Sequence, residues 1–117
     1  MAGLREVVRA LLDRPGVEAV AVVSGDGLTI DHAARGSFDA ETVAALIPGI
    51  MQNARRLGAT AERGEMGLGV LEFDRGLAVL SSLGPESLLL VLVAAGSNIG
   101  ELLHDLRTHR PALQQLG

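Results

Sequence analysis

Two segments of this chain, Val17–Ser24 and Ser87–Ala94, are apolar at almost every position. A strand with one face in solvent alternates polar and apolar residues, whereas a strand that is covered on both faces has no need of polar positions. The longest apolar run, Leu88–Ala95, is far too short to cross a membrane as a helix. The two segments therefore predict two strands in the interior of a sheet that is covered on both sides.

Three further segments are predicted to be strands, and short turns rich in glycine separate them from their neighbours. Turns of this length join antiparallel strands. One segment alternates apolar and polar residues and another begins with Gly67-Leu68-Gly69, which offers little side chain to pack, so both suit the edges of a sheet better than its interior. The three segments are Leu28–Ala33, Gly67–Phe73 and Leu77–Leu83.

Two amphipathic helices are predicted near the ends of the chain. The first, Leu4–Leu12, repeats apolar residues at helical spacing and is stopped by Pro15-Gly16. The last is capped by Ser97 and ended by Pro111, and a short amphipathic tail follows it. The apolar residues of the last helix are Ile99, Leu102, Leu103 and Leu106, and those of the tail are Leu113 and Leu116.

A long central helix is predicted to follow Asp39, which suits the N-cap position. Pro48 lies inside it, where proline costs about 3 kcal/mol, so we expect a kink or a restart of the helix at this residue. The helix has an apolar stripe and a second face that is small and polar. The stripe is Val43, Leu46, Ile47, Ile50, Met51, Ala54, Leu57 and Ala61, and the second face is Ala45, Gly49, Gln52, Asn53 and Arg56.

The composition bounds the class of protein. The chain has 117 residues, of which 48% are apolar, so we expect one domain spanning residues 1–117. It has no cysteine, every basic residue is arginine, and its only aromatic residues are Phe38 and Phe73. A net charge of −4 and the lack of stacking side chains argue against nucleic acid as a partner. The N-terminal residues lack the features of a signal peptide, so we expect a soluble cytoplasmic protein with no membrane span.

No group of residues has the spacing of a catalytic or metal site. His104 and His109 are five positions apart on one helix and point about 140° away from each other, while His32 lies on another element. The glycines Gly64 and Gly67 precede a strand rather than the helix that a phosphate-binding loop needs. We therefore expect no metal, no cofactor and no enzymatic activity.

The order of elements and several local motifs carry a resemblance to a known family. The order is helix, two strands, helix, three strands, helix, and the motifs include Gly25-Asp26-Gly27-Leu28, Arg55-Arg56-Leu57-Gly58 and the segment from Ser87 to Leu92 that leads into Ser97-Asn98-Ile99-Gly100. Over Leu4 to Leu106 the chain resembles the roadblock (dynein light-chain) family and its bacterial MglB-like members. The resemblance implies an α+β, profilin-like fold of three α/β/α layers. Its five-stranded antiparallel sheet has the order 2-1-5-4-3, the central helix on one face and the two terminal helices on the other.

The resemblance also implies a function. It implies a non-catalytic regulatory subunit that binds a small Ras-like GTPase and is able to modulate its nucleotide cycle. The alternative is a dimeric adaptor, or a ligand-sensing domain of the profilin-like type, with no GTPase partner. Arg35 lies in a loop, but we expect no catalytic arginine.

A homodimer is expected, because the glycine-bearing strand ends the sheet in the implied order and the central helix has its second, small-residue face. The basic end of the central helix has two interpretations: complementation of the helix dipole, or a surface for an acidic partner. The candidate dimer interface is Ala45, Gly49, Gln52, Asn53, Arg56, Gly67, Leu68, Gly69, Val70 and Leu71, and the candidate partner-binding residues are Arg55, Arg56 and Arg63.

Overall fold

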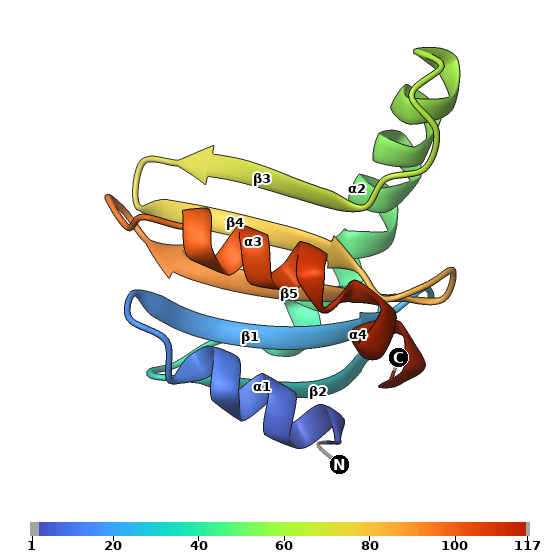
Figure 1. Ribbon diagram of the computed structural model, residues 1–117. Helices are drawn as coiled ribbons and strands as arrows, with labels where there is room; N and C mark the ends of the chain where they lie inside the picture. The colour runs from blue at the N-terminus through green and yellow to red at the C-terminus, as the bar shows by residue number, and fades with distance from the viewer. Residues whose placement is uncertain (1–2, 117) are drawn as a thin grey trace.

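A computed structural model describes residues 3–116 and contains a single five-stranded sheet between two layers of helix (Figure 1). The helices in this part of the chain are α1 (Leu4–Leu12), α2 (Ala40–Thr60), α3 (Gly100–Thr108) and α4 (Arg110–Leu116). The strands are β1 (Val17–Ser24), β2 (Thr29–Ala34), β3 (Leu68–Phe73), β4 (Gly76–Ser82) and β5 (Ser87–Ala94).

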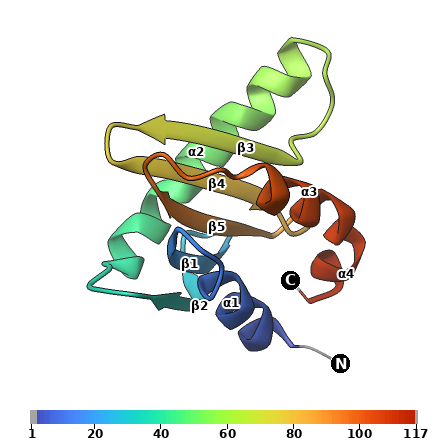
Figure 2. The same ribbon diagram turned by 60° about the vertical axis from the view of Figure 1, so that its left-hand side comes forward.

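The sheet is antiparallel throughout and has the order β2-β1-β5-β4-β3, which confirms the predicted fold. Figure 2 shows α2 crossing one face, while α1, α3 and α4 lie on the other. No helix within residues 3–116 is long and apolar enough to cross a membrane.

The two strands that are apolar throughout, β1 and β5, pair with each other in the middle of the sheet, as predicted. Val20 lies opposite Val91 and Val22 lies opposite Leu89, and all four side chains are fully buried against α1, α3 and α4. The neighbouring positions of both strands are buried against α2 instead. The lack of alternation in these segments thus has the physical cause that the sequence suggests: each strand is covered on both faces.

One detail of β1 differs from simple alternation. A bulge between Val17 and Ala19 shifts the register, so Val17 packs in the same cluster as Val20 and Val22. Simple alternation would place Val17 on the face of Ala21 and Val23. An inserted residue in one strand has this effect, because it transfers the preceding side chain to the opposite face.

The C-terminal end of the chain requires two corrections. Ser97 does not cap α3: the helix begins at Gly100 after Ile99, and Asn98 Oδ1 accepts the Gly100 N–H at 3.0 Å. Ser97 instead lies against Gly16, which leaves no room for a side chain there. The tail after α3 is itself helical, with Pro111 in the first turn of α4, where its missing N–H is not needed.

The start of α2 confirms the prediction that Asp39 is the N-cap residue. Asp39 accepts the Thr42 N–H at 3.1 Å, as an N-cap residue does. Hydrogen bonding by the Thr42 side chain, and then by its backbone N–H, holds the pKa of Asp39 below its ordinary value. The cap therefore stabilises α2 at neutral pH, and its contribution is lost as the pH falls through that lowered pKa.

The predicted restart at Pro48 does not occur, because α2 runs through this proline as one helix. Ile47 and Met51, on either side of Pro48, are both buried against the sheet, so the helix packs on the sheet before and after the proline. The β1–β2 turn approaches at this level: a Cβ on Gly27 would lie 3.2 Å from Pro48 Cγ, and Gly27 has a φ of +83°. Glycine is needed there for both reasons.

The end of α2 is a Schellman motif without its usual glycine. Arg63 N–H donates to Gly58 O at 2.7 Å and Glu62 N–H donates to Ala59 O at 3.2 Å. Glu62 has a φ of 57°, and it is the only residue other than glycine with positive φ in the part of the chain that the structure describes. A side chain in this left-handed conformation is strained.

Replacing Glu62 with glycine is expected to raise the free energy of unfolding by about 1 kcal/mol, because the left-handed strain disappears. Urea denaturation at a fixed protein concentration measures the change. The matched control is Glu65→Gly, the same substitution at an exposed position of the same loop without positive φ. An equal effect of the two substitutions, or a loss of stability in Glu62→Gly, would contradict this explanation.

Candidate protein-interaction surface

Helix α2 has two apolar faces rather than the single stripe that the sequence suggested. The face that packs against the sheet consists largely of small residues, Ala40 and Ala44, followed by Ile47 and Met51. The larger side chains of the predicted stripe do not share this face. Leu46, Ile50 and Leu57 point away from the sheet, and Leu46 and Leu57 are 63% and 70% exposed.

The apolar stripe predicted from the sequence is therefore divided between a buried face and an exposed face, and the reason is geometric. Positions 46, 50 and 57 recur at intervals of four and seven residues and form one row along the helix, while positions 40, 44, 47 and 51 form another. Hydrophobic spacing shows that both rows exist, but it does not show which of them meets the sheet. Alanines at the contact let the helix axis approach the strands closely.

The second half of α2 packs against little. From Gln52 to Thr60 no residue is buried, and the helix projects beyond the edge of the sheet on the side of β3 (Figures 1 and 2). A free helix of this length is only marginally stable in water. The outward apolar residue Leu57 lies within this segment and Ile50 lies just before it, so an additional contact there would stabilise the segment.

Strand β3 is open on its outer side. It pairs only with β4 within residues 3–116, and none of its residues is buried. Val70 and Leu71 are each 39% exposed, and Phe73 is also exposed. An edge of this kind, apolar and without a charged residue until Glu72, readily pairs with another strand.

The structure thus brings the predicted dimer-interface residues to two neighbouring elements. Ala45, Gly49, Gln52, Asn53 and Arg56 are all exposed on α2. On β3, Gly69 is half-buried and Leu68 packs against the core, so Leu68 offers a neighbouring chain its backbone rather than its side chain. Gly67, just before the strand, is covered by the Arg110 guanidinium.

We name Leu46, Ile50 and Leu57 together with the exposed β3 residues Val70, Leu71 and Phe73 the α2–β3 surface. The predicted interface lacked four of these six residues, namely Leu46, Ile50, Leu57 and Phe73. In the pairing of β3 with β4, Leu71 and Phe73 lie on the α2 face of the sheet and Val70 lies on the opposite face. The spacing of Leu46, Ile50 and Leu57 grouped them with the other apolar residues of the helix. The only sequence signal for their exposure is that α2 has more large apolar residues than one helix face can bury against the sheet.

The three candidate partner-binding arginines differ in their surroundings. Arg63 folds back on the end of α2, where its Nη1 donates to Ala61 O at 3.1 Å, which agrees with a role at the helix terminus. Arg55 reaches the β4–β5 turn, with Nη2 donating to Pro85 O at 3.4 Å. Arg56 is exposed on α2. Arg55 and Arg56 are therefore two basic residues on the projecting half of α2, and Arg55 faces the β4–β5 turn rather than the outward apolar row.

The loop arginine, Arg35, is tied to the body of the protein. Its Nε donates to Val17 O at 2.9 Å and its Nη2 donates to Leu12 O at 2.5 Å. Leu12 is the last residue of α1, so the guanidinium satisfies a carbonyl at a helix end, where positive charge is stabilising. This side chain joins α1 to β1 rather than projecting from the loop.

The fold has well-matched relatives among solved structures. A Roadblock/LC7 domain from Streptomyces avermitilis is 24% identical over 96% of this chain and 98% of its own, with a TM-score of 0.80. MglB from Myxococcus xanthus is 17% identical over 95% of this chain and 84% of its own. The gliding protein MglB from Thermus thermophilus is 16% identical over 99% of this chain and 93% of its own. Both MglB structures have TM-scores of 0.84.

Residues 4–93 match the Roadblock/LC7 domain family, so the chain belongs to this family. No curated protein matches the chain at a significant level of sequence similarity. The resemblance that the sequence motifs suggested is therefore confirmed at the level of family and fold, including the likeness to MglB.

The role of Arg35 leads to a stability prediction. Arg35→Ala is expected to lower the free energy of unfolding by about 1–2 kcal/mol, because two backbone carbonyls lose a charged donor. Chemical denaturation measures the loss. Arg75→Ala is the control, since Arg75 is exposed in the β3–β4 turn and should have almost no effect. If Arg35→Ala were as stable as Arg75→Ala, the hydrogen bonds from Arg35 to Leu12 and Val17 would not contribute to the free energy of unfolding.

Proposed function

We propose that the protein is a non-catalytic homodimeric regulator that binds a small Ras-like GTPase in the cytoplasm. The observation that carries the proposal is the α2–β3 surface, in which an outward apolar helix row and an open strand edge lie on neighbouring elements. Membership of the Roadblock/LC7 family and the structural likeness to MglB support it.

A dimer would cover the exposed parts of both β3 and α2. Two copies of β3 paired antiparallel about a two-fold axis would continue the sheet from one protomer into the next, which removes the open edge. The same axis brings the two α2 helices together, so that Leu46, Ile50 and Leu57 leave water. Gly49, three residues after Leu46, adjoins this row and allows the helices to approach closely.

The GTPase is proposed as the partner on the strength of the family resemblance, and the charge distribution agrees with it. The chain is acidic overall, with a net charge of −4, yet Arg55 and Arg56 form an exposed basic pair on the projecting half of α2. An exposed basic pair guides an acidic partner. Because Arg35 is held against α1 and β1, it is not free to enter a nucleotide pocket, and this supports a regulator that supplies no catalytic arginine.

The dimer is tested by placing a charge on each of its two elements. Gly49→Glu and Gly69→Arg are each expected to raise the dimer dissociation constant by orders of magnitude, because an unpaired charge would be buried between the copies. A side chain at Gly49 meets open space within the protomer, and one at Gly69 meets only the flexible end of Met66. Each protomer should therefore keep its fold.

Sedimentation equilibrium measures the association, and circular dichroism reports the fold. Gly36→Glu is the matched control, because Gly36 also faces open space but lies on the β2–α2 loop. A wild-type protein that remains monomeric at tens of micromolar, or two variants as strongly dimeric as the control, would contradict the proposed interface.

The partner is tested by reversing the basic pair. Arg55→Glu combined with Arg56→Glu is expected to weaken binding of a small Ras-like GTPase by at least about tenfold, or 1.4 kcal/mol. Isothermal titration calorimetry measures it. Arg9→Glu combined with Arg107→Glu is the control, which makes the same change in charge at exposed positions of α1 and α3.

Single-turnover GTP hydrolysis completes the test of the partner. Arg35→Ala should leave any stimulated rate within about tenfold of wild type. A thousandfold loss in Arg35→Ala would identify a catalytic arginine and contradict the non-catalytic role. Absence of any binding by the wild-type dimer would instead support the adaptor function without a GTPase partner.

A further inference from the structure

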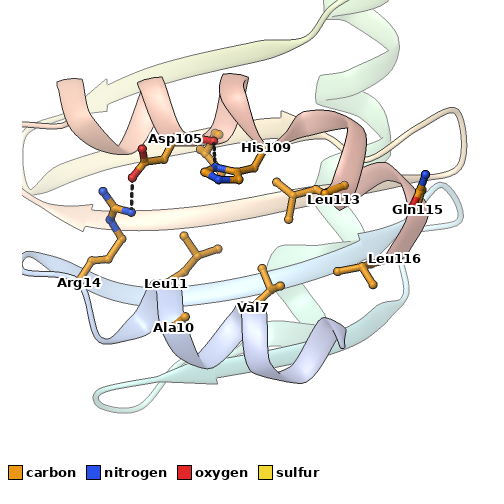
Figure 3. A pocket seen from close by; sticks show the side chains of 11 residues that line it. Val7, Ala10, Leu11, Arg14, Asp105, His109, Leu113, Gln115 and Leu116 are labelled. Carbon is orange, nitrogen blue, oxygen red and sulfur yellow. Dashed lines mark hydrogen bonds and ion pairs between the residues drawn. The ribbon is translucent and has the colours of Figure 1, made fainter. Parts of the chain in front are cut away.

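A groove lies on the face of the sheet opposite α2, between α1 on one side and α3 with α4 on the other (Figure 3). Its volume is about 530 Å³, within the range of small-molecule sites. The α1 wall presents Val7 and Leu11, and the opposite wall presents Leu106, Leu113 and Leu116. None of these residues belongs to the α2–β3 surface, so a dimer formed through that surface leaves the groove open.

Small side chains keep the two walls apart. Ala10 on α1 and Ala112 on α4 line the groove and are exposed, where larger apolar residues would close it. The wall residues Leu11, Leu106 and Leu113 are buried and belong to the hydrophobic core. The groove is therefore lined largely by apolar side chains.

One end of the groove is polar. Arg14 Nη1 donates to Asp105 Oδ2 at 2.9 Å, and His109 Nδ1 lies 2.9 Å from the carbonyl oxygen of Asp105 (Figure 3). The ion pair neutralises Asp105. Within residues 3–116, Nη1 is the only nitrogen of the Arg14 guanidinium with a protein acceptor, so the other N–H groups of this half-buried guanidinium are available to a further anion. Gln115 and Leu116 lie at the opposite end.

We propose that this groove binds a free single-chain amphiphile with a carboxylate head, such as a medium-chain fatty acid. The alkyl chain lies between the α1 and α4 walls, and the carboxylate accepts hydrogen bonds from Arg14, with His109 beside it. A guanidinium with unused donors at the end of an apolar channel complements this combination of head and tail.

The dimensions favour this occupant over a helix from another protein. An α-helix with its side chains is 10–12 Å across, whereas this groove runs only along the nine-residue α1, the end of α3 and the seven-residue α4. A single alkyl chain is thinner than a helix, and the groove volume of about 530 Å³ is in the range of small-molecule sites. Each buried methylene group is expected to tighten binding about fourfold, which gives a dependence on chain length.

The test uses decanoate and dodecanoate below their micelle-forming concentrations. Calorimetry should show one saturable site per chain, with dodecanoate binding about fifteenfold more tightly than decanoate, since the two acids differ by two methylene groups. Chemical-shift changes in ¹⁵N-labelled protein should gather on α1, α3 and α4. Dodecanol lacks the charge and should bind more weakly than dodecanoate.

Three variants test separately the contacts to the alkyl chain and the contacts to the carboxylate of the ligand. Ala10→Leu with Ala112→Leu fills the channel at exposed positions and should abolish binding, whereas Ala59→Leu, on the exposed end of α2, should not change it. Arg14→Gln should weaken dodecanoate at least tenfold and leave dodecanol unchanged. Asp105→Asn removes the competing carboxylate and should tighten dodecanoate.

Several results would overturn the proposal. They are no dodecanoate binding by the folded wild type, undiminished binding by the filled variant, or equal loss of dodecanoate and dodecanol in Arg14→Gln. Binding to phosphatidylglycerol vesicles without binding of free dodecanoate would assign the groove to a membrane surface instead. The dimer and the GTPase are tested by other residues, so failure here leaves the proposed function standing.

Discussion

The rest of the structure depends on the pairing of β1 with β5, two strands that are apolar on both faces. Because such strands are apolar on both sides, helices must cover both faces of the sheet. The two faces are covered unequally. Three short helices cover one face, and α2 alone covers the other. Only the first half of α2 has buried residues, and β3 at the sheet edge has none. The incomplete covering of one sheet therefore creates the surface that we assign to association.

The two faces offer different chemistry as a result. On the α2 side, an apolar helix row adjoins an open strand, and a second copy of the chain satisfies both at once through two-fold symmetry. On the opposite side, short helices carrying alanines leave a channel with a cationic end near Arg14. The first surface suits a protein and the second suits a small amphiphile. Because they lie on opposite faces of the sheet, one protomer could use both.

The sequence predicted the elements that can be recognised from their own residues alone. β1 and β5 were found because neither has a polar face, and the strand order came from the family resemblance. The outward row of α2 was assigned wrongly, since Leu46 and Leu57 are larger than Ala40 and Ala44 and only the packed structure shows that the small residues meet the sheet. Ser97 was taken for a cap because its side chain suits one, whereas its place is fixed by contact with the distant Gly16. The groove forms because α1 and α4 lie opposite each other on one face of the sheet. No sequence pattern within either helix shows this arrangement.

Dipolar spectroscopy on a spin-labelled chain tests the central claim, that α2 and β3 meet a second copy, most directly. The protein has no cysteine, so Thr60→Cys at the exposed end of α2 carries one label per protomer. The account predicts the signal of two coupled spins per particle, with one narrow distance distribution that disappears when Gly49→Glu is introduced. Signals from isolated spins at tens of micromolar protein, or a distance distribution that Gly49→Glu leaves unchanged, would contradict it.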